Sequence, residues 1–167
     1  MSIIDKFRLD NQVAVITGAG KGIGAAIARA FAEAGADVVL AARTETDLRR
    51  VAADITALGR RALVVPTDVL DFAQLQGLAD ATMEHFGRID ILVNNAGGFP
   101  PKPVAHTTAR EFEGAFRFNV STAFELSRIC APLMVNGPGS GTMLNISSIA
   151  GHKPTPCFAA YGLSLIH

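Results

Sequence analysis

Short, continuous apolar runs recur along the chain, separated by longer and partly polar segments. Residues 13–16 form one such run, which ends at Thr17 and Gly18, and residues 38–42 form a second. Runs of this length are typical of strands that are buried on both faces, as the strands of a parallel sheet are. Similar runs predict three further strands, at residues 62–65, 89–93 and 142–146.

The segments between these runs carry the periodicity of amphipathic helices. Residues 25–34 are rich in alanine, and Gly35 follows them where a helix C-cap belongs. Residues 44–47 resemble a capping box and predict the start of a second helix, which Gly59 ends.

Two more helices are predicted from their caps. Asp71 precedes a stripe of apolar residues at helical spacing, and Thr108 with Glu111 forms a capping box for a long helix that runs to about residue 133. Strands that alternate with helices predict right-handed crossovers and an α/β fold of Rossmann type, a doubly wound parallel sheet with helices on both faces. Without a linker or an internal repeat, residues 1–167 are expected to form a single domain.

Composition excludes several classes of protein. Fifteen basic residues balance fifteen acidic ones, so no basic field exists to attract nucleic acid or an anionic membrane surface. The N-terminal residues lack the layout of a signal peptide, and no apolar run reaches the roughly 18 residues of a membrane span. Cys130 and Cys157 are expected to be free buried thiols, the four histidines share no metal-ligand spacing, and a cytoplasmic location is expected.

A glycine-rich turn joins the first predicted strand to the first predicted helix. Gly18, Gly22 and Gly24 lie in the segment Thr-Gly-Ala-Gly-Lys-Gly-Ile-Gly at residues 17–24. Glycine is needed where such a turn is tight and its backbone approaches a pyrophosphate, and the helix start offers free N–H groups to the phosphates. The placement between a strand and a helix favours dinucleotide binding over an ordinary connecting loop.

The residues after the second predicted strand indicate which dinucleotide is bound. An acidic residue near the end of this strand selects NAD by holding the ribose 2′-hydroxyl, but Ala42 occupies that position. Arg43 follows it, Lys21 lies in the glycine turn, and both cations can bind a 2′-phosphate. The pattern favours NADP(H) over NAD(H), the alternative being two solvated surface cations.

Several short motifs follow one another from about residue 10 to residue 164. In this order they resemble the motifs of the classical short-chain dehydrogenase/reductase family. Within that family they are most similar to those of bacterial 3-oxoacyl-carrier-protein reductases and 7α-hydroxysteroid dehydrogenases. The resemblance implies a hydride transfer between a nicotinamide cofactor and a carbonyl/alcohol substrate. The motifs are Thr17-Gly18-x-x-x-Gly22-x-Gly24, Asp68-Val69, Asn94-Asn95-Ala96-Gly97, Asn119, Asn145-Ile146-Ser147-Ser148 and Tyr161.

The resemblance also implies a role for each matched residue. Tyr161 would be the general acid and base, Ser148 would polarise the substrate carbonyl, and Asn119 would join a proton relay through water. Asn94 and Ser147 would be structural. The residues expected to bind the cofactor are Gly18, Lys21, Gly22, Ile23, Gly24, Arg43, Asp68, Val69, Asn95, Ala96 and Gly97.

The sequence departs from the family pattern at Leu165. Family members carry a lysine four residues after the tyrosine, where it lowers the phenol pKa, and leucine cannot replace that charge. We therefore expect a C-terminally incomplete domain whose last strands are missing. Residues 142–146 would then form an exposed apolar edge, and the chain made alone would have low solubility.

Two functions remain open at this point. One is an NADP-preferring oxidoreductase that uses Ser148, Tyr161 and Asn119, and the other is a dinucleotide-binding remnant that cannot catalyse the reaction. The substrate would be a small molecule of the steroid, acyl thioester, sugar or quinone class. The resemblance implies a homo-oligomer, a dimer or tetramer, for the full-length form.

Overall fold

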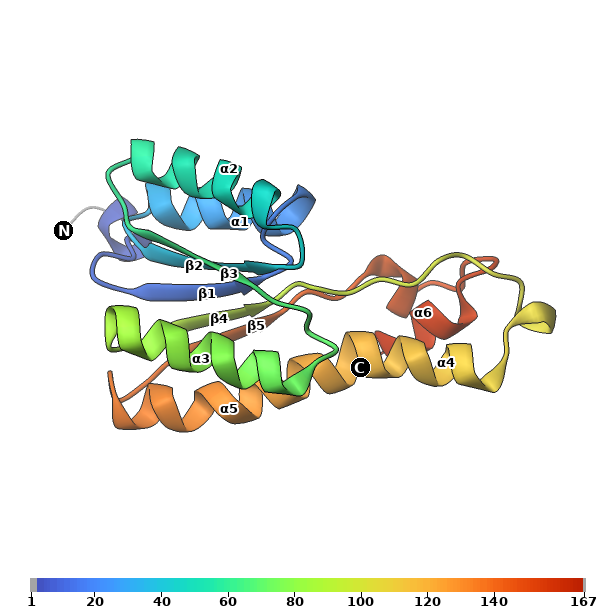
Figure 1. Ribbon diagram of the computed structural model, residues 1–167. Helices are drawn as coiled ribbons and strands as arrows, with labels where there is room; N and C mark the ends of the chain where they lie inside the picture. The colour runs from blue at the N-terminus through green and yellow to red at the C-terminus, as the bar shows by residue number, and fades with distance from the viewer. Residues whose placement is uncertain (1–2, 167) are drawn as a thin grey trace.

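Five parallel strands form the centre of the protein (Figure 1). The computed structural model describes residues 3–166, apart from the side chain of Ile4. The strand order β3-β2-β1-β4-β5 reverses direction at β1, as it does in doubly wound sheets. The strands are β1 (Val13–Thr17), β2 (Asp37–Ala42), β3 (Ala62–Pro66), β4 (Ile91–Asn94) and β5 (Thr142–Asn145).

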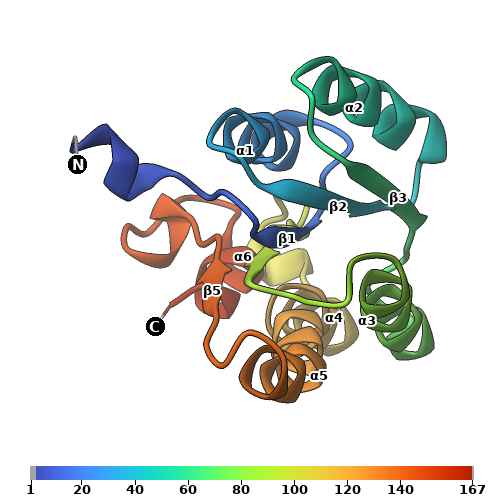
Figure 2. The same ribbon diagram turned by 90° about the vertical axis from the view of Figure 1, so that its left-hand side faces the viewer.

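Helices cover both faces of this sheet (Figure 2). α1 and α2 lie on one face, and α3 and α5 lie on the other, which confirms the predicted α/β architecture of Rossmann type. α4 and α6 lie together beyond the carboxyl ends of the strands (Figure 1). The helices are α1 (Gly22–Glu33), α2 (Glu45–Ala57), α3 (Phe72–Phe86), α4 (Ala109–Phe116), α5 (Thr122–Asn136) and α6 (Ala159–Ser164), with short 3-10 helices at Ile4–Phe7, Val104–His106 and Ile149–Gly151.

The apolar runs of the sequence are buried between these layers. β1 and β2 are inaccessible to solvent along almost their whole length, because helices cover both of their faces. One core cluster joins the sheet to α1 and α2, and the other joins it to α3 and α5. Cys130 is buried in the second cluster, whereas Cys157 is exposed, so the expectation of two buried thiols is wrong for Cys157.

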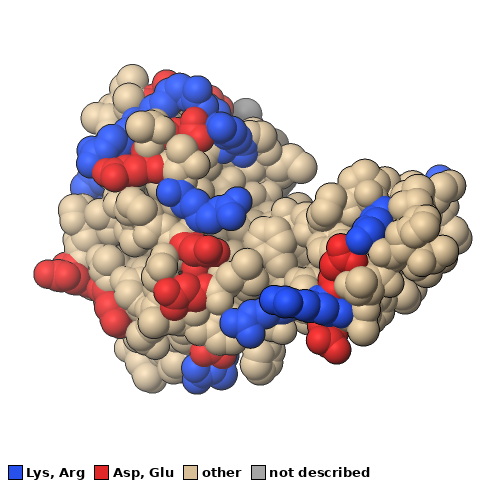
Figure 3. Space-filling view, turned by 45° about the vertical axis from the view of Figure 1, so that its right-hand side comes forward, with Lys and Arg blue, Asp and Glu red and all other residues tan. Residues whose placement is uncertain are grey.

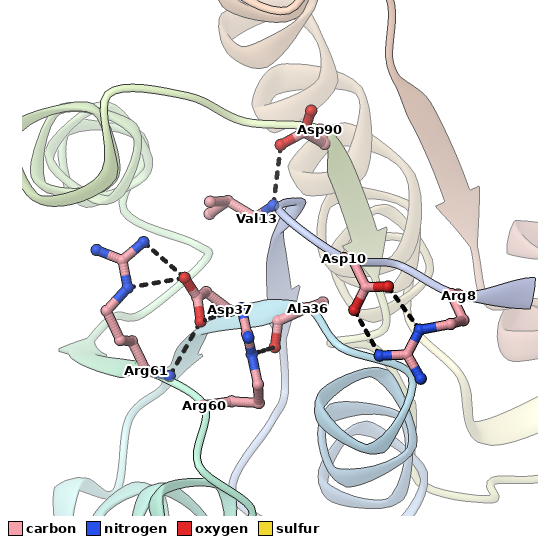
Figure 4. Close-up of polar contacts among 8 residues, drawn as sticks. All are labelled: Arg8, Asp10, Val13, Ala36, Asp37, Arg60, Arg61 and Asp90. Atoms are coloured by element: carbon pink, nitrogen blue, oxygen red, sulfur yellow. Dashed lines mark hydrogen bonds and ion pairs between the residues drawn. The ribbon is translucent and has the colours of Figure 1, made fainter. Parts of the chain in front are cut away.

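The fourth strand begins later than its apolar run predicts. The predicted strand covered residues 89–93, but β4 starts at Ile91. The Asp90 carboxylate instead accepts a hydrogen bond of 2.9 Å from the N–H of Val13 (Figure 4). It is also paired with Arg88. A side chain thus satisfies the first backbone donor of β1, in place of a strand partner.

A second carboxylate is buried at the same end of the sheet (Figure 4). Asp37, at the start of β2, lies 2.8 Å from the Arg60 guanidinium and accepts hydrogen bonds from the backbone and side chain of Arg61, at 3.0 and 2.7 Å. Burial by itself raises the pKa of the Asp37 carboxyl, but the Arg61 hydrogen bonds and the nearby arginine charges outweigh it. The pKa therefore lies below its ordinary value.

The long helix predicted from Thr108 is interrupted. Its capping box forms as expected, with Thr108 and Glu111 bonded reciprocally. A π-helical turn at Arg117–Ser121 then separates α4 from α5. π-helical turns of this kind are frequent at functional sites, and this one carries Asn119.

Charged side chains of both signs are interspersed over the surface shown in Figure 3, without a broad field of one sign on that face. The outer part of the α4 and α6 region is mostly uncharged there. None of the helices in residues 3–166 is both long and apolar enough to cross a bilayer.

Candidate active site

The glycine turn after β1 has the close backbone approaches that its glycines predict. Gly18 has a left-handed backbone (φ 66°), and a Cβ there would lie 2.7 Å from Asn95 Nδ2. A Cβ on Gly24 would lie 2.3 Å from the carbonyl oxygen of Gly18. Contacts this short are not tolerated, so the turn needs glycine at both positions.

The N-terminus of α1 emerges from this turn without a side-chain cap. Lys21 occupies the N-cap position, but its side chain makes no capping hydrogen bond. The first N–H groups of a helix have no partners within the helix, and they carry the positive end of its dipole. A tight turn and an uncapped helix start fit the diphosphate of a dinucleotide.

Hydrogen bonds hold the glycine turn against the loop after β4. The Thr17 hydroxyl accepts the N–H groups of Asn95 and Ala96, both at 3.0 Å. The Asn95 amide group donates to the Thr17 carbonyl at 3.0 Å. The assignment of Asn95 to the cofactor stays a prediction, and its side chain also braces the turn. Thr17 stood in the glycine motif without a role of its own, and its hydroxyl holds the loop after β4 in place.

A first cleft of about 320 Å³ opens beside this turn. It is lined by residues from the turn, the end of β2, the start of α2 and the loop after β3. Arg43 is exposed at its rim, and Asp68 accepts a hydrogen bond of 3.0 Å from the Leu70 N–H. The predicted residues that line it are Gly18, Lys21, Arg43, Asp68, Val69 and Ala96.

A second cleft of about 890 Å³ lies on the other side of the turn, at the carboxyl ends of β4 and β5. Ala96 lines both clefts, so the two meet beside the start of α1. The predicted residues that line the second cleft are Gly22, Ile23, Asn95, Ala96, Gly97, Asn119, Ser148 and Tyr161. Gly24 is the one predicted site residue that lines neither cleft, because it packs beneath the turn.

Asn119 is fixed within the second cleft by the π-helical turn. Its side-chain oxygen accepts the N–H of Gly98 at 2.7 Å, and its amide group donates to the Ser164 hydroxyl at 2.8 Å. Ser164 in turn donates to the carbonyl oxygen of Tyr161 at 2.8 Å. A chain of hydrogen bonds therefore links Asn119 to the backbone of Tyr161, and the sequence did not point to Ser164.

Ser148 and Tyr161 enter the same cleft from different elements. Ser148 follows β5, and its hydroxyl oxygen accepts the N–H of Ala150 at 3.2 Å, which leaves the hydroxyl proton available. Tyr161 lies on α6, half-buried, with its ring centroid 5.9 Å from that of Phe158. The pair offers one hydrogen-bond donor and one phenol to a molecule in the cleft.

Asn94 and Ser147 brace the cleft from below. Asn94 donates to Asn145 at 2.9 Å and to Ser127 at 3.1 Å, which ties β4 to β5 and α5. The Ser147 hydroxyl donates to the carbonyl oxygen of Leu165 at 3.1 Å. All three hydrogen bonds lie within the protein, which agrees with a structural part for Asn94 and Ser147.

Leu165 lines the second cleft, four residues after Tyr161. Its side chain is buried and apolar, at the position where the resemblance to the family implies a lysine. In the part of the chain that the structure describes, no lysine or arginine lines this cleft. The tyrosine therefore has no cationic neighbour among the described residues that line this cleft.

Comparisons with known proteins agree with this geometry. An uncharacterized oxidoreductase of Mycobacterium tuberculosis is 48% identical over 160 residues, which make up 96% of this chain and 61% of that protein. The 7alpha-hydroxysteroid dehydrogenase of Escherichia coli K12 is 40% identical, over 96% of this chain and 62% of that protein. The chain thus spans about three fifths of the length of these relatives.

A solved structure shows the same fold. The 7 alpha-hydroxysteroid dehydrogenase complexed with NADH and 7-oxo glycochenodeoxycholic acid matches with a TM-score of 0.93 and 39% identity, over 98% of this chain and 64% of that one. The family model for short chain dehydrogenases matches residues 12–164. The glycine turn, the two clefts and the ordered motifs are therefore those of a family member, and the chain belongs to the short-chain dehydrogenase family.

Proposed function

We propose that this protein is a nicotinamide-dependent oxidoreductase that interconverts a small carbonyl compound and its alcohol. One observation carries the proposal: Ser148, Tyr161 and Asn119 line the same cleft as the uncapped start of α1. A ligand whose diphosphate lies at that helix start would extend into the cleft that holds a phenol and a hydroxyl.

The residues of the cleft have distinct tasks in this reaction. A bound nicotinamide supplies or accepts the hydride. The Tyr161 phenol exchanges the proton at the substrate oxygen, and the Ser148 hydroxyl donates a hydrogen bond to that oxygen where negative charge develops. Asn119 holds the loop at Gly98 and the end of α6 in register, and the family resemblance assigns it a place in a proton relay through water.

We propose that the cofactor is NADP(H) in preference to NAD(H). The acid that would hold a ribose 2′-hydroxyl is replaced by Ala42 at the end of β2, and Arg43 is exposed beside the first cleft. An arginine in this position offers a planar fork of donors to a 2′-phosphate. The 7 alpha-hydroxysteroid dehydrogenase of known structure was solved with NADH, so the preference would distinguish this chain from that relative.

A second function is favoured by one observation, the apolar Leu165 in the catalytic cleft. Without a neighbouring cation, the phenol of Tyr161 lacks the charge that promotes proton exchange near neutral pH. On this alternative the chain binds a dinucleotide in both clefts and does not turn over.

The proposal includes the cellular compartment and the oligomeric state of the protein. The free thiols of Cys130 and Cys157 suit a reducing compartment, and we propose a cytoplasmic protein. We also propose a homo-oligomer, a dimer or tetramer, for the full-length form. Apolar side chains of the α4–α5 region that remain exposed, among them Phe116 and Phe124, support this proposal.

Cofactor titration followed by turnover assays tests the proposal. NADPH and NADH are titrated by calorimetry, and consumption of each is followed with ketones of the steroid, acyl thioester, sugar and quinone classes. Turnover that falls about a hundredfold or more in Tyr161→Phe and Ser148→Ala supports the oxidoreductase. Binding without turnover supports the second function, and the absence of binding by either cofactor would overturn both.

A further inference from the structure

The lysine of the glycine turn is not free to meet a ligand. Lys21 Nζ lies 3.0 Å from Asp47 Oδ2, and their side chains are 74% and 16% exposed, respectively. The pair joins the turn after β1 to the first turn of α2, and both residues line the first cleft. The cation that the sequence assigned to a 2′-phosphate is already bound to a carboxylate.

Asp47 is held in this position from several directions. Arg50, one turn further along α2, lies 3.6 Å from its other carboxylate oxygen. The turn lies close against it, since a Cβ on Gly20 would be 3.1 Å from the Asp47 Cβ. The capping box predicted for Thr44 does not form: the Thr44 side chain makes no capping hydrogen bond, and the Asp47 carboxylate is directed toward Lys21 and Arg50.

The charges that line the cleft therefore balance. Lys21 and Arg43 are the basic lining residues, and Asp47 and Asp68 are the acidic ones. Within residues 3–166, Arg43 makes no ion pair or hydrogen bond, so it is the cation of the cleft that is ready for an anion. Lys21 becomes available only when it leaves Asp47.

We propose that Asp47 is a specificity-determining residue, which competes with the cofactor's 2′-phosphate for Lys21 and so limits the preference for NADP(H) over NAD(H). The inference rests on the proposed function, because it presumes that a nicotinamide dinucleotide occupies the first cleft. It adds a residue that neither the glycine motif nor the strand-end rule identifies.

The competition follows from the charges. A phosphate monoester carries about −1.5 to −2 charge near neutral pH, so it attracts Lys21 and is repelled by Asp47. To bind the phosphate, Lys21 must exchange one anionic partner for another, which offsets part of the gain. NAD(H) has a hydroxyl in place of this phosphate and does not require the exchange.

A double-mutant cycle tests the competition. NADPH and NADH dissociation constants are measured by calorimetry at low salt for the parent chain, Asp47→Asn, Lys21→Met and the double variant. We expect Asp47→Asn to tighten NADPH binding about three- to tenfold and to leave NADH binding within about twofold. In the Lys21→Met background the same change should have less than half of that effect on the binding free energy.

Asp54→Asn is the matched control. Asp54 also lies on α2 and pairs with an arginine, Arg29 at 2.7 Å, but it does not line the first cleft. Each of the two variants therefore removes one negative charge from the same helix, α2. The control should bind both cofactors as the parent does, and thermal melting should show that every variant folds.

Each remaining outcome overturns the inference. If NADPH binds the parent chain and Asp47→Asn leaves its affinity unchanged, Asp47 does not limit the preference, and the proposed function stands. Equal tightening of both cofactors would indicate a general charge effect, and equal tightening with and without Lys21 would indicate direct repulsion only. If no variant binds either cofactor, the inference fails together with the proposed function.

Discussion

Leu165 is the residue at which this chain departs most clearly from the pattern that the family resemblance implies, because a lysine is expected at that position of the cleft. A lysine there would place an ammonium group on the cleft wall, four residues after Tyr161. A cation close to a phenol stabilises the phenolate and lowers the phenol pKa, and each unit of lowering favours the ionised form tenfold. The leucine leaves the cleft without that stabilisation.

We predict that Leu165→Lys raises kcat at pH 7 by about tenfold or more, because an ammonium group in the cleft favours proton exchange at the substrate oxygen. The measurement is the pH dependence of kcat between pH 6 and 10, in which the basic limb should move to lower pH. Leu163→Lys adds the same charge two residues away, outside the second cleft, and should leave the profile unchanged. An unmoved profile for Leu165→Lys would show that the missing lysine does not limit this chain.

The ordered motifs named most of the predicted residues that line the two clefts, while the roles of those residues stay predictions. The glycines, Ser148, Tyr161 and Asn119 could be recognised because each residue type has a narrow chemical use at its place in the motif order. Ser164 could not, because its hydroxyl matters only through the hydrogen bond that reaches it from Asn119, on a distant helix. A short polar side chain carries no local signal of such a contact.

At the scale of elements, two similar capping sequences behave differently. Thr108 and Glu111 form the predicted box, whereas Thr44 makes no capping bond and Asp47 turns to Lys21. Both helices begin where the pattern predicts, so the apolar stripe decides the helix and tertiary charge decides the cap. The π-helical turn around Asn119 was not predicted, because the apolar stripe of the long helix continues through it without a break.

The buried carboxylate of Asp37 makes the stability of the sheet depend on pH. Its pKa is lowered in the folded protein, so folding favours the ionised form. The resulting stabilisation is present above the unfolded pKa of about 4 and is lost as pH falls through the lower, folded value. The ion pairs with Arg60 and Arg61 thus contribute at neutral pH and disappear in acid.

We predict that Asp37→Asn lowers the free energy of unfolding by about 1–3 kcal/mol at pH 7, because two arginines and a backbone N–H lose a charged acceptor. The difference from the parent should shrink as pH falls below about 4. Urea denaturation at pH 7, 4 and 3 measures it. Asp80→Asn, which removes an exposed carboxylate bonded to Gln76, should have little effect. A constant difference at all three pH values would contradict the assignment.

At the scale of the whole molecule, alternating strands and helices predicted the parallel sheet and the helical layers on its two faces. The pattern could not show how the two clefts meet at Ala96, because that depends on where the loop after β4 lies against the glycine turn. The Thr17 hydroxyl fixes that loop by accepting two of its N–H groups. Hydrogen bonds therefore join the carboxyl ends of β1 and β4, although these two segments lie far apart in the sequence.

The strand β5 forms an edge of the sheet, and its sequence predicts an exposed apolar edge that lowers the solubility of the chain. Within residues 3–166, β5 pairs with β4 alone, so its outer backbone groups have no strand partner. Met143 packs against the core, while Leu144, on the opposite side of the strand, is 40% exposed. An exposed apolar strand at a sheet edge is a template for association with another chain.

We predict that Leu144→Lys increases the soluble, monodisperse fraction of the 167-residue chain, because a charge on an edge strand opposes strand-to-strand pairing. Light scattering at matched concentrations, before and after warming, measures it. Leu58→Lys is the control, since Leu58 is 46% exposed but follows α2, away from β5. If both variants improved solubility equally, charge alone would explain the gain. If the parent chain were already monodisperse on warming, the β5 edge would not drive association.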